Sequence, residues 1–74
     1  MLFAKRLANA RKRLGLTTKE LADKIGVSRS YISLLENYNR LPGKSILPKI
    51  ASALGVKKTT ITDWYLKTLE EKLK

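Results

Sequence analysis

The sequence predicts an all-α fold: a compact domain of five helices in a chain of 74 residues. Apolar residues recur at intervals of three and four, which is the helical period. No stretch of alternating β-branched residues argues for a strand. Glycines and small hydroxyl residues interrupt the apolar pattern where helices would end and begin. A chain of this length has room for a single domain with a small core, so we treat residues 1–74 as one unit.

The first helix is expected from about Leu2 to Leu14, and Gly15 ends it because glycine readily adopts a left-handed conformation. Basic residues cover most of its surface. One face is apolar and consists of Phe3, Leu7, Ala10 and Leu14.

Residues 17–37 predict two short helices joined by a tight turn. Thr17 and Glu20 have the spacing of a capping box, in which each side chain accepts a backbone N–H of the other residue. Gly26 ends the first of these helices, and Ser28 caps the second. Ala22 is small where the two helices would cross. The residues expected to face the core are Leu21, Ala22, Ile25, Ile32 and Leu35.

Residues 38–44 are expected to form a basic loop, in which Pro42 and Gly43 interrupt any helical pattern. A fourth helix is expected from about Ile46 to Leu54, with Ser45 as its cap and Pro48 in its first turn.

The last helix is expected to start in the threonine cluster 59–62, with Thr60 as its cap and Asp63 in its first turn. This C-terminal segment comprises residues 60–74, and the helix is expected to reach about Leu73.

The two central helices resemble the helix-turn-helix of the Cro/repressor-type (XRE-like) family of bacterial and phage transcription regulators. The resemblance runs from about residue 7 to residue 64. It rests on Arg11, Leu14-Gly15-Leu16, Glu20-Leu21-Ala22, Ile25-Gly26-Val27-Ser28, Leu35-Glu36-Asn37, Ile50-Ala51 and Ala53-Leu54-Gly55-Val56. It implies the five-helix domain of the phage-repressor DNA-binding type, in which the helix at 29–37 enters a DNA major groove.

The composition favours a polyanionic partner, either nucleic acid or an acidic membrane surface. Sixteen Lys and Arg against six Asp and Glu give a formal net charge of +10. The chain has no cysteine and no histidine, which excludes disulfides and zinc-finger ligation, and we expect no metal and no cofactor. No signal peptide and no apolar run of membrane-spanning length is recognisable. We therefore expect a cytoplasmic, nucleoid-associated protein.

The helix at 29–37 has a polar side that can read base edges. Successive residues rotate by about 100°, which places Ile32 and Leu35 opposite the polar residues. Arg29 is the strongest candidate, because its guanidinium matches the two acceptors of guanine. Leu34 either contacts a thymine methyl or packs partly buried, and Tyr31 is expected to pack along its ring. The predicted base-contacting residues are Arg29, Ser30, Ser33 and Leu34.

Phosphate contacts are expected at the edges of the two central helices. The resemblance implies such contacts for Thr18 and Asn37, and a helix N-terminus at Thr18 attracts anions. Loop residues could reach the same strand. The predicted phosphate-contacting residues are Thr18, Ser28, Asn37, Arg40 and Lys44. The resemblance also implies an internal ion pair between Arg11 and Glu36, which would be structural.

The last helix carries more apolar surface than one small domain usually hides. Ile61, Trp64 and Tyr65 form a patch that could dock on the first and fourth helices. Leu66, Leu69 and Leu73 form a second stripe, which either covers the chain's own core or makes the interface of a homodimer. In a symmetric dimer the two reading helices would enter successive major grooves about 34 Å apart.

The sequence therefore predicts a sequence-specific regulator that binds double-stranded DNA as a dimer on a near-palindromic operator and acts as a repressor. The alternative is an antitoxin-like interaction protein that neutralises a partner protein and also binds DNA. A membrane-surface role is disfavoured, because the basic residues are dispersed over several faces. We expect no enzyme, because the sequence contains no nucleophile–base pair and no metal-ligand cluster.

Overall fold

The computed structural model describes residues 2–38 and 40–73 of the chain. Within them the fold is all-helical, as predicted, with five helices and no strand. The helices are α1 (Leu2–Arg13), α2 (Thr18–Ile25), α3 (Arg29–Asn37), α4 (Leu47–Leu54) and α5 (Lys58–Leu73). Met1, Asn39 and Lys74, which belong to the expected domain, loop and last helix, lie outside the described residues.

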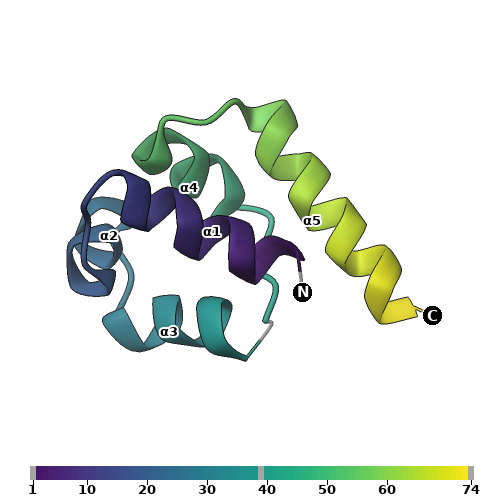
Figure 1. The fold of residues 1–74 in the computed structure, drawn as a ribbon, viewed down its shortest axis with the longest axis horizontal. Coiled ribbons are helices and arrows are strands. Elements are labelled where there is room, and N and C mark those ends of the chain that lie inside the picture. The colour runs from purple at the N-terminus through teal and green to yellow at the C-terminus, as the bar shows by residue number, and fades with distance from the viewer. Residues whose placement is uncertain (1, 39, 74) are drawn as a thin grey trace.

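Four helices form the body of the molecule, and α5 lies along one side of it (Figure 1). The pair α2 and α3 occupies one corner, with α1 crossing the middle and α4 above it. The C-terminal end of α5 extends beyond the body, while the first residues of α1 lie close to α5.

Most of the expected helix ends are present. Thr17 and Glu20 form both bonds of the capping box: the Glu20 N–H donates to Thr17 Oγ1 at 3.1 Å, and the Thr17 N–H donates to Glu20 Oε1 at 2.9 Å. The backbone bond to Thr17 lowers the pKa of the Glu20 carboxyl below its ordinary value. Gly26 ends α2 with φ +86°, and Ser28 caps α3 by accepting the Tyr31 N–H.

The two caps expected from Ser45 and Thr60 are wrong. Ile46 occupies the cap position of α4 in a helical conformation, and no side chain caps that helix; Pro48 does lie in its first turn. The loop closes instead through a turn in which the Ile46 N–H donates to the Gly43 carbonyl. Helix α5 starts two residues before Thr60, which therefore lies inside its first turn.

The core gathers side chains from all five helices. Its largest fully buried members are Phe3, Leu7, Leu21, Ile32, Leu35, Ile50 and Ile61. Leu14 was expected on the apolar face of α1, but its side chain is 51% exposed. Leu14 directly follows the last residue of α1, where the chain turns toward α2, and its N–H still donates to the Ala10 carbonyl at 3.2 Å.

Helix α5 docks on α1 and α4, as the patch around Ile61 and Trp64 predicted. Ile61 is buried, and the Trp64 ring meets the Phe3 ring edge-to-face at a centroid distance of 6.5 Å. Thr68 is also fully buried, and its Oγ1 accepts the Phe3 backbone N–H at 2.8 Å. Since the first N–H groups of a helix have no partner inside it, Thr68 supplies α1 with a cap from another helix.

Candidate nucleic-acid interface

The turn between α2 and α3 fixes the angle at which α3 leaves the domain. The Ala22 carbonyl accepts the N–H groups of both Gly26 and Val27, at 2.8 and 3.0 Å. Ala22 itself is buried, and its small side chain leaves room for the two helices to approach each other. Val27 packs against the core from the turn. The turn is therefore held by backbone bonds at one end and by apolar contact at the other.

Helix α3 is divided into a buried and an exposed side. Ile32 and Leu35 are fully buried, whereas Arg29 and Ser30 are exposed and Leu34 is 37% exposed. In the described part of the chain no hydrogen bond or ion pair engages the Arg29 guanidinium, which leaves its five donors available. A planar cation beside short hydroxyl side chains matches the acceptor-rich edges of the major groove.

Ser33 and Asn37 are joined on the outward side of α3. The Asn37 Nδ2 donates to Ser33 Oγ at 3.1 Å, one helical turn away. The sequence predicts separate contacts for these two residues, and the bond between them was not among the predictions. Their spacing of four residues was the available signal, because such residues are neighbours on a helix surface.

Tyr31 packs along its ring against the core, as expected. Its hydroxyl accepts the Gly43 N–H at 3.4 Å. The bond ties the loop after α3 to the first turn of that helix.

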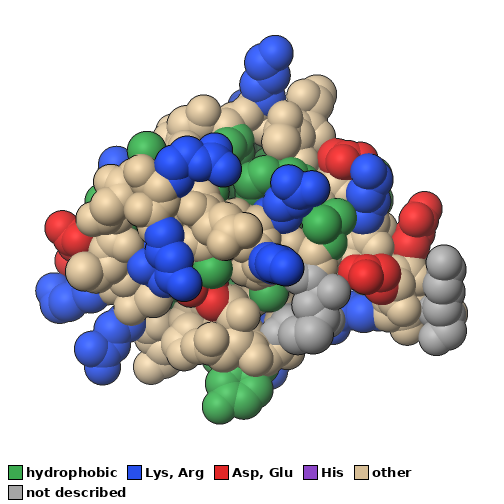
Figure 2. Space-filling view, viewed as in Figure 1, with side chains coloured by type: hydrophobic (Ala, Val, Ile, Leu, Met, Phe, Trp, Pro, Cys, Tyr) green, Lys and Arg blue, Asp and Glu red, His purple; other side chains and the backbone are tan. Residues whose placement is uncertain are grey.

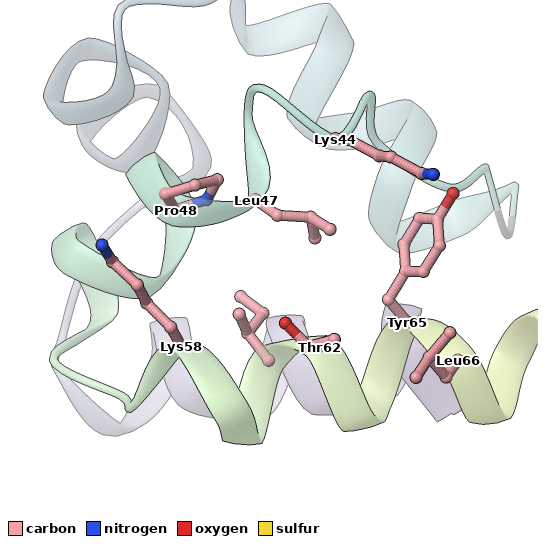
Figure 3. A pocket seen from close by; sticks show the side chains of 8 residues that line it. Lys44, Leu47, Pro48, Lys58, Thr62, Tyr65 and Leu66 are labelled. Atoms are coloured by element: carbon pink, nitrogen blue, oxygen red, sulfur yellow. The ribbon is translucent and has the colours of Figure 1, made fainter.

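The predicted phosphate-contacting residues come from several elements of the chain. Thr18 is the first residue of α2, beside the capping box, and Ser28 uses its hydroxyl to cap α3. Arg40 is exposed in the loop after α3. Lys44 lies on the rim of a groove between α4 and α5, near Tyr65 (Figure 3). Thr18 and Ser28 are thus placed at helix N-termini, where the backbone dipole favours anions.

The ion pair between Arg11 and Glu36 is present and joins α1 to α3. Arg11 Nε and Nη2 donate to the two carboxylate oxygens of Glu36 at 2.7 and 3.0 Å. Arg11 Nη1 also donates to the Leu16 carbonyl at 2.8 Å. The side chains are only 12% and 7% exposed. The hydrogen bond to Glu36 raises the pKa of Arg11 despite the opposing effect of burial. The pair anchors the buried side of α3 and leaves its outward side unoccupied.

The charge of the molecule is unevenly distributed over the helices. Helix α1 contains five basic residues and no acidic one, whereas the three lysines of α5 are balanced by Asp63, Glu70 and Glu71. Figure 2 shows Lys and Arg side chains spread over the visible face, with acidic side chains mainly around α5. Helix α5 is therefore a neutral surface in a chain of net charge +10.

A mainly apolar groove of about 370 Å³ runs between α4 and α5. Leu47 points into it, and Lys44 and Lys58 stand at opposite ends (Figure 3). Leu66 lies on its rim and is 52% exposed, while Leu73, further along α5, is 79% exposed. Leu69 is half-buried. No pattern in the sequence predicts the groove, because its walls come from separate parts of the chain.

No cluster of residues that could hold a metal ion occurs within residues 2–38 and 40–73. None of the helices described is both long and apolar enough to span a membrane.

Comparison with known proteins identifies the arrangement. A family model described as helix-turn-helix matches residues 7–64. The chain is 35% identical over 63 residues to the HTH-type transcriptional regulator SinR of Bacillus subtilis, covering 84% of this chain and 57% of that protein. It is 47% identical over 45 residues to an uncharacterized HTH-type transcriptional regulator of Methanothermobacter thermautotrophicus, covering 61% of this chain and 65% of that one. The chain thus spans less than two thirds of the length of these curated relatives.

A solved structure shares the fold. The crystal structure of the clp gene regulator ClgR from C. glutamicum superposes with a TM-score of 0.73 at 25% sequence identity. The match covers 90% of this chain and 87% of that one, so it includes helices on both sides of the α2–α3 pair.

Proposed function

The chain belongs to the helix-turn-helix family, and from this membership we propose that it is a sequence-specific DNA-binding regulator of transcription. Helix α3 enters the major groove with its outward side toward the bases. The regulator acts as a repressor on a near-palindromic operator and works in the cytoplasm, associated with the nucleoid. The proposal draws further support from the relatives, which are named transcriptional regulators.

The observation that carries the proposal is the outward side of α3. Arg29 has no partner in the described residues, and short side chains surround it, so the helix backbone can approach a base pair closely. Thr18 stands at the N-terminus of the neighbouring helix, where free backbone N–H groups attract a phosphate. Arg29 therefore reads bases, and Thr18 positions the helix on the backbone.

A homodimer through α5 completes the proposal. Leu66 and Leu73 expose apolar surface on the one long helix whose charges cancel, so two copies can meet there without the repulsion of their net charges. Exposed apolar residues in a row on one helix are typical of a helix–helix interface. Two linked copies of α3 gain affinity from occupying two half-sites at once.

The groove between α4 and α5 favours a second candidate function, an antitoxin-like interaction with another protein. Such a partner would insert an apolar side chain between Lys44 and Lys58. Isolation of the chain from its native host distinguishes the two: a stoichiometric second protein supports the partner, and a self-dimer supports the repressor.

Selection of bound sequences from a random pool of duplex DNA tests the main proposal. We expect a symmetric motif whose half-sites are about 10 base pairs apart. Arg29→Ala should weaken specific binding by about 1–3 kcal/mol and relax the preference at one base pair. Thr18→Ala is the matched control and should weaken binding to all sequences alike, because phosphate contacts carry no base information. Enrichment of no sequence, or equal affinity of the Arg29 variant for the motif, contradicts the proposal.

A further inference from the structure

The bond between Asn37 and Ser33 leaves the Ser33 hydroxyl with a defined hydrogen-bonding role. A serine hydroxyl has one hydrogen to donate and two lone pairs that accept. The Asn37 amide occupies one lone pair, at 3.1 Å. Among residues 2–38 and 40–73, none accepts the Ser33 hydroxyl hydrogen. The hydroxyl is thus held as an acceptor toward Asn37, with its hydrogen left for a partner outside the protein.

We propose that Asn37 fixes the direction of hydrogen bonding at Ser33. The Ser33 hydroxyl accepts from Asn37 and therefore donates to a keto oxygen in the major groove, either guanine O6 or thymine O4. The same hydroxyl then discriminates against the amino groups of adenine and cytosine, which present a donor at that position. The contrast is sharpest between thymine and cytosine, because adenine also offers the acceptor N7. This inference rests on the proposed DNA-binding function and names the base chemistry that one residue of α3 selects.

The discrimination follows from the cost of an unmade hydrogen bond. To accept from a base amino group, Ser33 would use its remaining lone pair and turn its hydrogen away from the base. Within a dehydrated interface that hydrogen would have no acceptor, which is unfavourable. A keto oxygen instead completes the bonding of the hydroxyl while the bond from Asn37 remains intact.

Asn37 is a positioning residue in this arrangement, because it acts on the base through Ser33. Its second amide hydrogen and its carbonyl oxygen remain available, since within the described residues its side chain bonds only to Ser33. The amide can therefore hold a phosphate with one hydrogen and Ser33 with the other. The position of the DNA backbone and the polarity of the base-reading group are then fixed by the same side chain.

Ser30 provides a matched control on the same helix. Its side chain is exposed on the outward side, and within the described residues nothing bonds to its hydroxyl. That hydroxyl is free to turn and can donate or accept. The loss of Ser30 should therefore not remove a keto-over-amino preference.

The test is selection from a random duplex pool with the full chain and five variants, each checked for helix content by circular dichroism. The variants are Ser33→Ala, Asn37→Ala, Asn37→Asp, Ser30→Ala and the double change Ser33→Ala with Asn37→Ala. We expect the parent to prefer guanine or thymine over adenine or cytosine by about three- to tenfold at one position of the half-site. Ser33→Ala should abolish this preference, and Ser30→Ala should retain it.

The Asn37 variants separate positioning from a simple loss of affinity. Asn37→Ala should reduce the preference at that same position, and it should change nothing there once Ser33 is already alanine. Asn37→Asp should shift the preference toward adenine or cytosine, because a carboxylate accepts the hydroxyl hydrogen and leaves Ser33 to accept from the base.

Two results would overturn the inference while leaving the proposed function intact. One is that the parent selects a motif, but Asn37→Ala weakens binding to all sequences equally and leaves every base preference unchanged. The other is a preference for an amino base at the position lost in Ser33→Ala. A parent chain that enriches no sequence at all contradicts both the proposed function and this inference.

Discussion

Arg11 and Glu36 carry opposite charges into the space between α1 and α3, where little water reaches them. At such a site the attraction between the partners compensates for lost hydration, and removing one partner leaves a charge without compensation. The pair therefore ties the orientation of α3 to the first helix of the domain.

Glu36→Ala should lower the free energy of unfolding by about 3 kcal/mol, because it leaves Arg11 charged and unpaired. Arg11→Ala should be at least as destabilising, since it also removes the bond to the Leu16 carbonyl. Urea melts of both single variants and the double variant measure the coupling, and the double should cost less than the sum. Strict additivity would show that the two side chains do not interact.

Glu20 makes part of the stability depend on pH. Its folded pKa is lowered by the bond from the Thr17 backbone, so the folded chain holds fewer protons than the unfolded chain as the pH falls. The contribution of Glu20 to the free energy of unfolding is complete above the ordinary pKa of a glutamate carboxyl. It is lost as the pH falls through the lower pKa of Glu20 in the folded chain. Between about pH 6 and about pH 3, Glu20→Gln should lose less stability than the parent. Equal losses in urea melts at the two pH values would contradict this.

At the scale of the helices, signals local in sequence were sufficient for most of the fold. The capping box of α2, the glycine after it and the Ser28 cap depend on residues within four positions of one another, and all three are present. The starts of α4 and α5 were misplaced, because the loop closes through a backbone turn and Thr60 has a place inside α5.

The candidate site was only partly predictable for a related reason. The exposed side of α3 follows from its helical period, but the bond that the Phe3 N–H donates to Thr68 Oγ1 joins residues 65 positions apart. No local pattern marks such a contact. The same holds for the groove between α4 and α5, whose walls meet only in the folded chain.

Thr68→Val should destabilise the domain by about 1–3 kcal/mol, since it keeps the shape of the side chain but leaves the buried Phe3 N–H without an acceptor. Thr68→Ser is the matched control, because it retains the oxygen. Hydrogen exchange reads the effect directly: the Phe3 amide should exchange faster in the valine variant and stay protected in the serine variant. Equal protection in both would contradict a cap supplied by α5.

At the scale of the whole molecule, charge and apolar surface are separated. Helix α1 contains five basic residues and no acidic one, while α5 combines a neutral charge balance with exposed leucines. The first arrangement suits a polyanion, and the second suits a protein surface. One small domain can therefore present two different surfaces without one interfering with the other.

Leu66→Lys should yield a folded, helical monomer that binds one half-site weakly, because the exposed Leu66 contributes to the proposed dimer and little to the core. Sedimentation and circular dichroism measure assembly and folding on the same sample. Leu69→Lys is a less clean test, since its side chain is half-buried and the charge would also disturb the subunit. A Leu66 variant that remains folded and dimeric would exclude this stripe as the interface.

Synthesis from the N-terminus delivers Phe3 long before Thr68. While α5 is still within the ribosome, the Phe3 amide can bond only to water, and the Phe3 ring lacks its contact with Trp64. Helix α1 thus gains its cap only after α5 has been made, because the capping contact is 65 positions away in sequence. In a nascent chain halted before residue 68, the Phe3 N–H at the start of α1 has no Thr68 hydroxyl to accept it. The bond between Phe3 and Thr68 therefore cannot form until α5 has left the ribosome.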